Sequence, residues 1–167
     1  AAPRGRARQM NAGAAIAGAD ALLFLHADTR LPADADELVL RALQRRAWGR
    51  FDVRIDGRSR WLPLVAALMN LRSRLTGIAT GDQAIFVTRA AFDRIGGFPD
   101  QPLMEDVEIS RRLRAIARPA CLRARVDTSG RRWDAHGAWP TIRLMWRLRW
   151  RYWRGASPQS LAEAYRR

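Results

Sequence analysis

The sequence predicts an α/β fold with one substantial core, because short apolar runs alternate with longer segments of helical periodicity. Residues 22–25 and 84–87 are apolar runs with the length of buried strands. In residues 34–47 and 104–117, apolar side chains recur at the spacing that places them on one face of a helix. A chain of 167 residues is long enough to build such a core. We therefore expect a sheet with helices packed against it.

The first half of the chain contains several of these elements in order. An Ala/Gly-rich helix is expected over residues 11–19, before the strand at 22–25. The helix at 34–47 has acidic residues in its first turn, where they interact favourably with the helix dipole. Residues 48–55 alternate apolar and polar side chains, which predicts a half-buried strand. An apolar helix over residues 61–75 follows.

The second half continues the same alternation. The strand at 84–87 leads into a short helix over residues 90–95, which a glycine pair ends. The helix at 104–117 comes next, and residues 122–126 are expected to form a short strand.

The chain is strongly basic, with a formal net charge of +14. Such a charge attracts anionic partners, for example a nucleotide diphosphate or an acidic membrane surface. The arginines are scattered over the whole sequence and no nucleic-acid-reading motif accompanies them, so nucleic acid is an unlikely partner. A single cysteine and the lack of a membrane-spanning apolar stretch favour a cytoplasmic protein.

Residues 139–153 are expected to form a basic, aromatic amphipathic helix. One face contains Ile142, Trp146, Trp150 and Trp153, and the adjoining row contains Arg143, Arg147, Arg151 and Arg154. Such a helix fits the interface of an anionic membrane, where indole rings lie at the level of the headgroups. The alternative is that the tryptophans pack on the domain and the arginines form its solvated rim.

Three polar clusters lie where strands end or helices begin. Asp28 and His26 follow the first apolar strand, Asp82 precedes the strand at 84–87, and a Glu-Asp pair opens the helix at 104–117. In an open α/β sheet, the carboxyl ends of strands border the ligand crevice. Oxygen ligands suit Mg²⁺ or Mn²⁺, so we expect Asp28 with His26 to form part of a metal site. The alternative role for Asp28 is a turn or a helix cap.

The Glu-Asp pair, Glu105 and Asp106, is a candidate for acid–base chemistry. A carboxylate at a helix N-terminus is held in its charged form and partly oriented, which suits a general base. The alternative is that both residues only occupy the first helical turn, where acidic residues are common.

Five motifs occur in a recognisable order. They are GRARQMNAG at residues 5–13, FLHADT at 24–29, GDQAIFV at 81–87, GGFP at 96–99 and LMEDVE at 103–108. Together they resemble family 2 glycosyltransferases of the GT-A fold, and most of all a small bacterial subgroup linked to arsenosugar biosynthesis. The resemblance implies a partial GT-A core over residues 1–137, with a Rossmann-like mixed sheet flanked by helices. Residues 138–167 would be an amphipathic helical tail.

The resemblance also implies a reaction, the transfer of a sugar from a nucleotide-diphospho-sugar to an acceptor hydroxyl with inversion at the anomeric carbon. Asp28 would bind the divalent cation and the diphosphate, and His26 stands where the family has another aspartate. Asp106, with Glu105 beside it, would be the catalytic base. Gly81 and Asp82 would line the pocket for the donor sugar and the acceptor.

A further element, at residues 129–133, resembles a family segment in which an arginine contacts the diphosphate and a tryptophan lies near the acceptor. This assigns Arg131, Arg132 and Trp133 to substrate binding, for which the planar guanidinium group is well suited. The alternative for the two arginines is a solvated pair. Asn11 completes the predicted substrate-binding set.

The family's first strands, which hold the nucleobase and ribose, have no counterpart in this sequence, which enters the family pattern just before Asn11. We therefore expect weak or absent nucleotide-sugar binding. The alternative function is that of an inactive fragment that binds a membrane surface or a partner protein.

Overall fold

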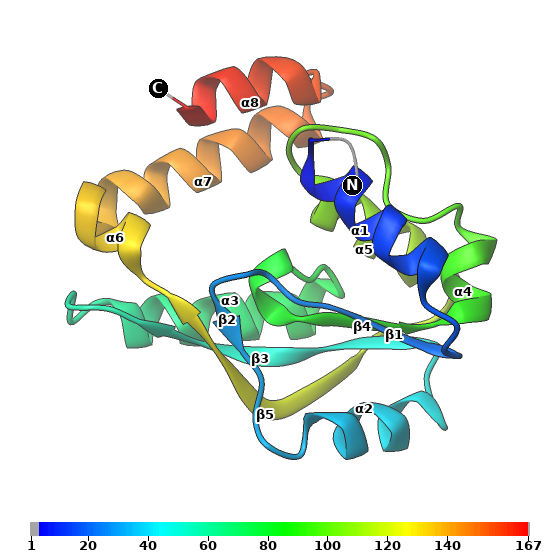
Figure 1. The fold of residues 1–167 in the computed structure, drawn as a ribbon. Coiled ribbons are helices and arrows are strands. Elements are labelled where there is room, and N and C mark those ends of the chain that lie inside the picture. The colour runs from blue at the N-terminus through cyan, green and yellow to red at the C-terminus, as the bar shows by residue number, and fades with distance from the viewer. Residues whose placement is uncertain (1–3, 167) are drawn as a thin grey trace.

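The computed structural model describes residues 4–166, which form a mixed five-stranded sheet with helices on both faces (Figure 1). The strands are β1 (Ala21–Phe24), β2 (Thr29–Arg30), β3 (Trp48–Asp56), β4 (Ile85–Thr88) and β5 (Ala120–Ser129). They lie in the order β1-β4-β3-β5-β2. β3 and β5 are parallel, and the other neighbouring pairs are antiparallel. The predicted α/β class, with a mixed sheet flanked by helices, is confirmed.

Helices cover the two faces of this sheet. The first apolar layer of the core involves α1 (Arg6–Ile16), α4 (Arg89–Arg94) and α5 (Glu105–Ile116), and the second involves α2 (Ala35–Leu43) and α3 (Leu62–Thr76). Leu113 of α5 packs in the first apolar layer with Trp48 of the sheet. Leu62 of α3 packs in the second layer with Phe51. Burial of both layers fixes the strand ends that carry the predicted site.

The carboxyl-terminal segment folds as α6 (Arg131–His136), α7 (Ala138–Trp153) and α8 (Pro158–Arg166). Leu148 of α7 and Leu161 of α8 are buried in a third apolar cluster, together with Leu103 and Met104 from the loop before α5. This cluster attaches the tail to the residues that immediately precede the Glu-Asp pair. Figure 1 shows α7 and α8 side by side above the sheet. No helix within residues 4–166 is both long and apolar enough to cross a bilayer.

Trp146, Trp150 and Trp153 of α7 are exposed, so the alternative in which they pack on the domain is wrong. The exposed fractions are 73% for Trp146, 58% for Trp150 and 80% for Trp153. The smaller Leu148, from a different face of the helix, is the residue that reaches the core. The expected helix itself is confirmed.

Three elements have bounds that differ clearly from the sequence-based expectation, and one of them is α2, which ends at Leu43 instead of residue 47. α1 begins at Arg6 instead of residue 11, because Gly5, at φ 137°, turns the chain into the helix ahead of the Ala/Gly-rich run. It ends at Ile16, where Ala17 adopts an extended conformation. β5 is longer than residues 122–126 because it pairs with β3 on one side and with β2 on the other.

β3 was expected to be half-buried, and this prediction is wrong for its first six residues, all of which are buried. They include the charged residues Arg50 and Asp52. The Asp52 carboxylate forms an ion pair with Arg50 and a bidentate one with Arg74 of α3, at 2.9 and 2.8 Å. Mutual neutralisation lets charged side chains occupy positions that the alternating pattern assigns to the surface.

Candidate active site

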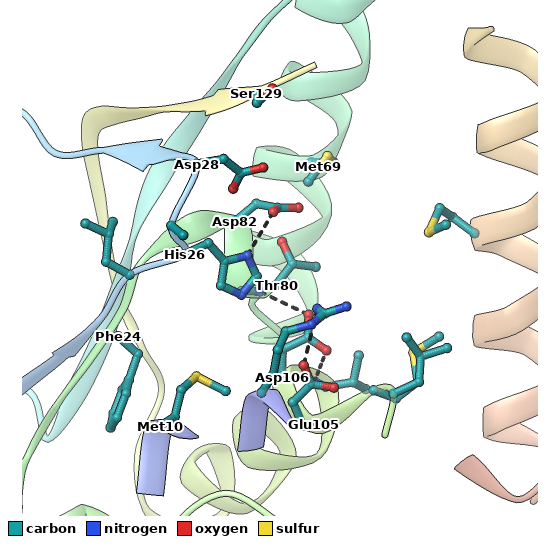
Figure 2. Close-up of a pocket in the computed structure, with 18 of the residues that line it drawn as sticks. Met10, Phe24, His26, Asp28, Met69, Thr80, Asp82, Glu105, Asp106 and Ser129 are labelled. Atoms are coloured by element: carbon teal, nitrogen blue, oxygen red, sulfur yellow. Dashed lines mark hydrogen bonds and ion pairs between the residues drawn. The ribbon is translucent and has the colours of Figure 1, made fainter. Parts of the chain in front are cut away.

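A cavity of about 1580 Å³ opens along β1, between the start of α5 on one side and α3 and α7 on the other. Every predicted site residue except Asn11 lines it, namely His26, Asp28, Gly81, Asp82, Glu105, Asp106, Arg131, Arg132 and Trp133. Figure 2 shows the labelled members of this set around the cavity, with the His26 ring directed at the Asp82 carboxylate. The fold thus gathers side chains from distant motifs at one place. Their roles stay predictions.

Gly81 connects two of the motifs through its backbone. Its N–H donates a hydrogen bond to Asp106 Oδ2 at 3.0 Å. A Cβ atom at this position would lie 2.2 Å from Nε2 of His26, so any side chain would displace the imidazole ring. Glycine is therefore the residue that allows His26 and Asp106 to approach the same turn.

Asp106 lies in the first turn of α5, at the cavity wall. Besides the bond from Gly81, its Oδ1 accepts a hydrogen bond from the backbone N–H of Val107 at 2.7 Å. Met104, the residue just before the first residue of α5, has φ 66°, a left-handed conformation that is costly for a residue with a side chain. The contacts and this sharp helix entry together fix the Asp106 carboxylate where it can meet a ligand.

Glu105 differs from its neighbour because its side chain is only 3% exposed. Its Oε1 lies 3.3 Å from Nη1 of Arg6, and among the described residues its buried Oε2 has no hydrogen-bond partner. Burial, followed by the negative charge of Asp106, raises the pKa of Glu105. Since Arg6 already engages Glu105, Asp106 is the better placed of the two to contact a substrate.

His26 is paired with a carboxylate. Its Nδ1 lies 3.3 Å from Oδ1 of Asp82, and this hydrogen bond raises the pKa of His26 against the opposing effect of burial. The pair therefore favours the cationic ring. Metal ions bind the neutral imidazole, so the contact with Asp82 works against the predicted metal-ligand role of His26.

Asp28 is the more accessible oxygen donor for a cation. Its carboxylate is partly exposed at the cavity wall, 3.6 Å from Nη2 of Arg131. Within residues 4–166, no cluster of three or more His, Cys, Asp or Glu side chains is arranged to hold a metal ion. Mg²⁺ in phosphate-binding sites commonly uses only one or two carboxylates and completes its shell with water and substrate phosphates. Asp28 fits that kind of site, and the metal stays a prediction.

The three residues of the Arg-Arg-Trp element, at positions 131–133, lie in three different environments. The backbone N–H of Ser129, at its start, donates to the carbonyl of Asp28 at 3.2 Å, which brings the element to the cavity. Arg131 is largely exposed, whereas Arg132 stacks on the ring of Tyr165 at 3.8 Å and donates to the Tyr165 carbonyl. Trp133 packs partly against the apolar layer under the sheet. Arg131 is therefore the arginine of this element that is available to a ligand.

Asn11 lies outside the cavity and has a structural contact. Its side-chain amide donates to the carbonyl of Phe98 at 2.8 Å and accepts from the Phe98 N–H at 2.9 Å. Both ends of the amide thus hold the loop after α4 against α1. The contact explains an asparagine at this position without a substrate.

Besides Arg6, which engages Glu105, the cavity is lined by two arginines that the sequence did not single out, Arg72 of α3 and Arg149 of α7. No sequence signal distinguished them, because arginine is abundant throughout the chain. Only the packing of two distant helices around one cavity brings them together.

The chain was compared with family models, with curated proteins and with solved structures, and none of them matched.

Proposed function

We propose that this chain is the core of a glycosyltransferase that moves a sugar from a nucleotide-diphospho-sugar to an acceptor hydroxyl. The observation that supports the proposal is the single cavity that collects Asp28, Asp82, Asp106 and Arg131 from separate segments of the chain. A carboxylate for proton transfer and a cationic group for a diphosphate are the parts that this reaction needs.

Asp106 is the general base in this proposal. It removes the proton from the acceptor hydroxyl while the hydroxyl oxygen forms a bond to the anomeric carbon of the sugar. The bond between that carbon and the diphosphate oxygen breaks, and the nucleoside diphosphate leaves with the electron pair. A single displacement of this kind inverts the configuration at the anomeric carbon. The two backbone N–H groups that hold Asp106 keep it oriented for proton transfer.

Asp28 and Arg131 are assigned to the diphosphate. A divalent cation, Mg²⁺ or Mn²⁺, held by Asp28 would neutralise charge on the leaving group. Arg131 is exposed and close to Asp28, and its planar guanidinium can donate two parallel hydrogen bonds to phosphate oxygens. Once a ligand is bound, the ion pair between Arg131 and Asp28 would be replaced by contacts with the diphosphate and its cation.

Calorimetric titration of UDP and of GDP into the chain, with Mn²⁺ present, tests this assignment. We expect weak binding that falls at least about tenfold in Asp28→Ala, because a lost charge-assisted contact is worth about 1.5–3 kcal/mol. Asp93→Ala is the matched control, since Asp93 is an exposed carboxylate of α4 that does not line the cavity. Equal heats for the wild-type chain and Asp28→Ala would contradict the diphosphate assignment.

A second candidate function is attachment to an anionic membrane on its cytoplasmic side, and the exposed face of α7 favours it. Trp146, Trp150 and Trp153 are exposed there, and arginines recur along the same helix. Arg154 lies 5.2 Å from the ring of Trp150, so cationic and aromatic groups are adjacent at the end of the helix. Indoles and arginines together fit the headgroup region of an acidic bilayer.

Flotation with lipid vesicles tests the membrane assignment. The chain is expected to float with vesicles that contain phosphatidylglycerol, and much less with pure phosphatidylcholine or at high salt. A Trp150→Ala, Trp153→Ala double variant should lose most of the bound fraction. Leu40→Ala is the control, because Leu40 is an exposed apolar residue of α2. Unchanged flotation of the double variant would rule out α7 as the membrane contact.

A further inference from the structure

Arg72 is a partly buried cation without a compensating anion. It extends from α3 into the wall of the cavity, and its Nη2 atom is buried with no hydrogen-bond partner among the described residues. Burial, followed by the positive charge of nearby Arg149, lowers the pKa of Arg72 to about 10. A guanidinium in this environment is left with unsatisfied donors, which is costly unless a ligand completes them.

Arg149 places a second cation close to the first. It belongs to α7, a helix far from α3 in the sequence, and lines the same cavity. Within residues 4–166, neither Arg72 nor Arg149 forms an ion pair with a carboxylate. Arg50, another neighbour of Arg72, is by contrast neutralised by Asp52. Two helices therefore bring two positive charges close together, and no carboxylate within residues 4–166 forms an ion pair with either of them.

The charge and shape of this pair select the class of ligand. A phosphate group carries up to two negative charges and offers several oxygens, enough to accept hydrogen bonds from two guanidinium groups at once. A neutral sugar hydroxyl would leave the repulsion between the arginines in place. The charge of Asp106 also acts on Arg72, so the proposed base faces the same cavity within electrostatic reach of the pair.

We propose that Arg72 and Arg149 form a phosphate subsite that holds a phosphate group of the acceptor, so that its hydroxyl is presented to Asp106. The identification of the ligand as the acceptor rests on the proposed transferase function, whereas the binding of a phosphate group does not. The subsite is distinct from Asp28 and Arg131, which are assigned to the diphosphate of the donor.

The phosphate group can belong to a soluble molecule or to a lipid. Leu68, Leu71 and Leu75 of α3 are exposed and line the cavity beside Arg72, so an apolar chain attached to the phosphate could lie against them. Both sources present the same charged group to the arginine pair. The three leucines affect only whether the soluble phosphate or the lipid-borne one binds more tightly.

Calorimetric titration without any donor tests the subsite directly. The probes are inorganic phosphate, octyl phosphate below its micelle concentration, and octanol as the uncharged comparison. The variants are Arg72→Gln and Arg149→Gln, and the matched control is Arg147→Gln, which removes an exposed arginine of α7 that does not line the cavity. Circular dichroism and thermal melting establish that each variant is folded, and Arg149→Gln tests the subsite independently if the more buried Arg72→Gln unfolds.

We expect at least one phosphate probe to bind, and its affinity to fall about tenfold or more in each cavity variant and to stay unchanged in Arg147→Gln. Comparable binding of the two phosphate probes identifies a soluble phosphate as sufficient, and much tighter binding of octyl phosphate identifies a lipid-borne one. Absence of binding by both phosphate probes, or affinities in Arg72→Gln and Arg149→Gln equal to the wild-type value, would overturn the proposal. Loss of UDP binding in Asp28→Ala is a separate result, so failure of the subsite and failure of the transferase assignment are distinguishable.

Discussion

Replacing Asp52 with alanine is expected to lower the free energy of unfolding by about 3–5 kcal/mol. The substitution leaves Arg50, whose side chain is completely buried, without its carboxylate, and it also removes the partner of Arg74. The chain must then either unfold locally or admit water around a buried guanidinium. Since β3 is at the centre of the sheet and pairs with both β4 and β5, the loss affects the whole core.

Urea denaturation followed by circular dichroism measures this effect. Asp127→Ala is the control, because it breaks a solvent-accessible ion pair between Asp127 of the neighbouring strand β5 and Arg54. Water solvates the charges that remain there, so the control should lose far less stability. Losses of similar size in the two variants would contradict a buried ion-pair network as the reason for the burial of β3.

Much of the fold could be predicted from the sequence, because periodicity records which residues face the core. The strand that became β4 and the helices that became α3, α5 and α7 have nearly the expected bounds. The burial of β3 could not be predicted, since alternation identifies Arg50 and Asp52 as surface residues until their pairing with Arg74 is known. The exposure of Trp146 also depends on where α7 packs, which is a tertiary property.

The candidate site, like the fold, could be predicted from the sequence only in part. Motif positions indicated all of the predicted residues that line the cavity, and Asn11 besides, because these motifs lie where strands begin or end and where helices begin. The contact between His26 and Asp82 was not predicted, although it changes the charge that His26 favours. Arg72 could not be distinguished from the other arginines, because its significance comes from burial and from Arg149 on another helix.

Replacing Asp106 with asparagine is expected to slow sugar transfer by about 10²–10⁴-fold, the usual contribution of a general base. Asparagine has almost the same size but cannot accept the acceptor's proton at neutral pH. It can still accept one of the two backbone hydrogen bonds, from Gly81 or Val107, so the start of α5 should persist. Asp100→Asn is the control, because Asp100 is an exposed carboxylate paired with Arg8 outside the cavity.

The central claim is that the cavity transfers a sugar with Asp106 as its base. Its most direct test is the rate at which the wild-type chain, Asp100→Asn and Asp106→Asn release nucleoside diphosphate from UDP-glucose, UDP-N-acetylglucosamine and GDP-mannose, with Mg²⁺ or Mn²⁺ and octyl glycerol phosphate as the acceptor. We predict release from at least one donor by the wild-type chain and by Asp100→Asn, and a rate lower by at least about a hundredfold in Asp106→Asn. Equal rates in the wild-type chain and Asp106→Asn, or no release from any donor, would contradict it.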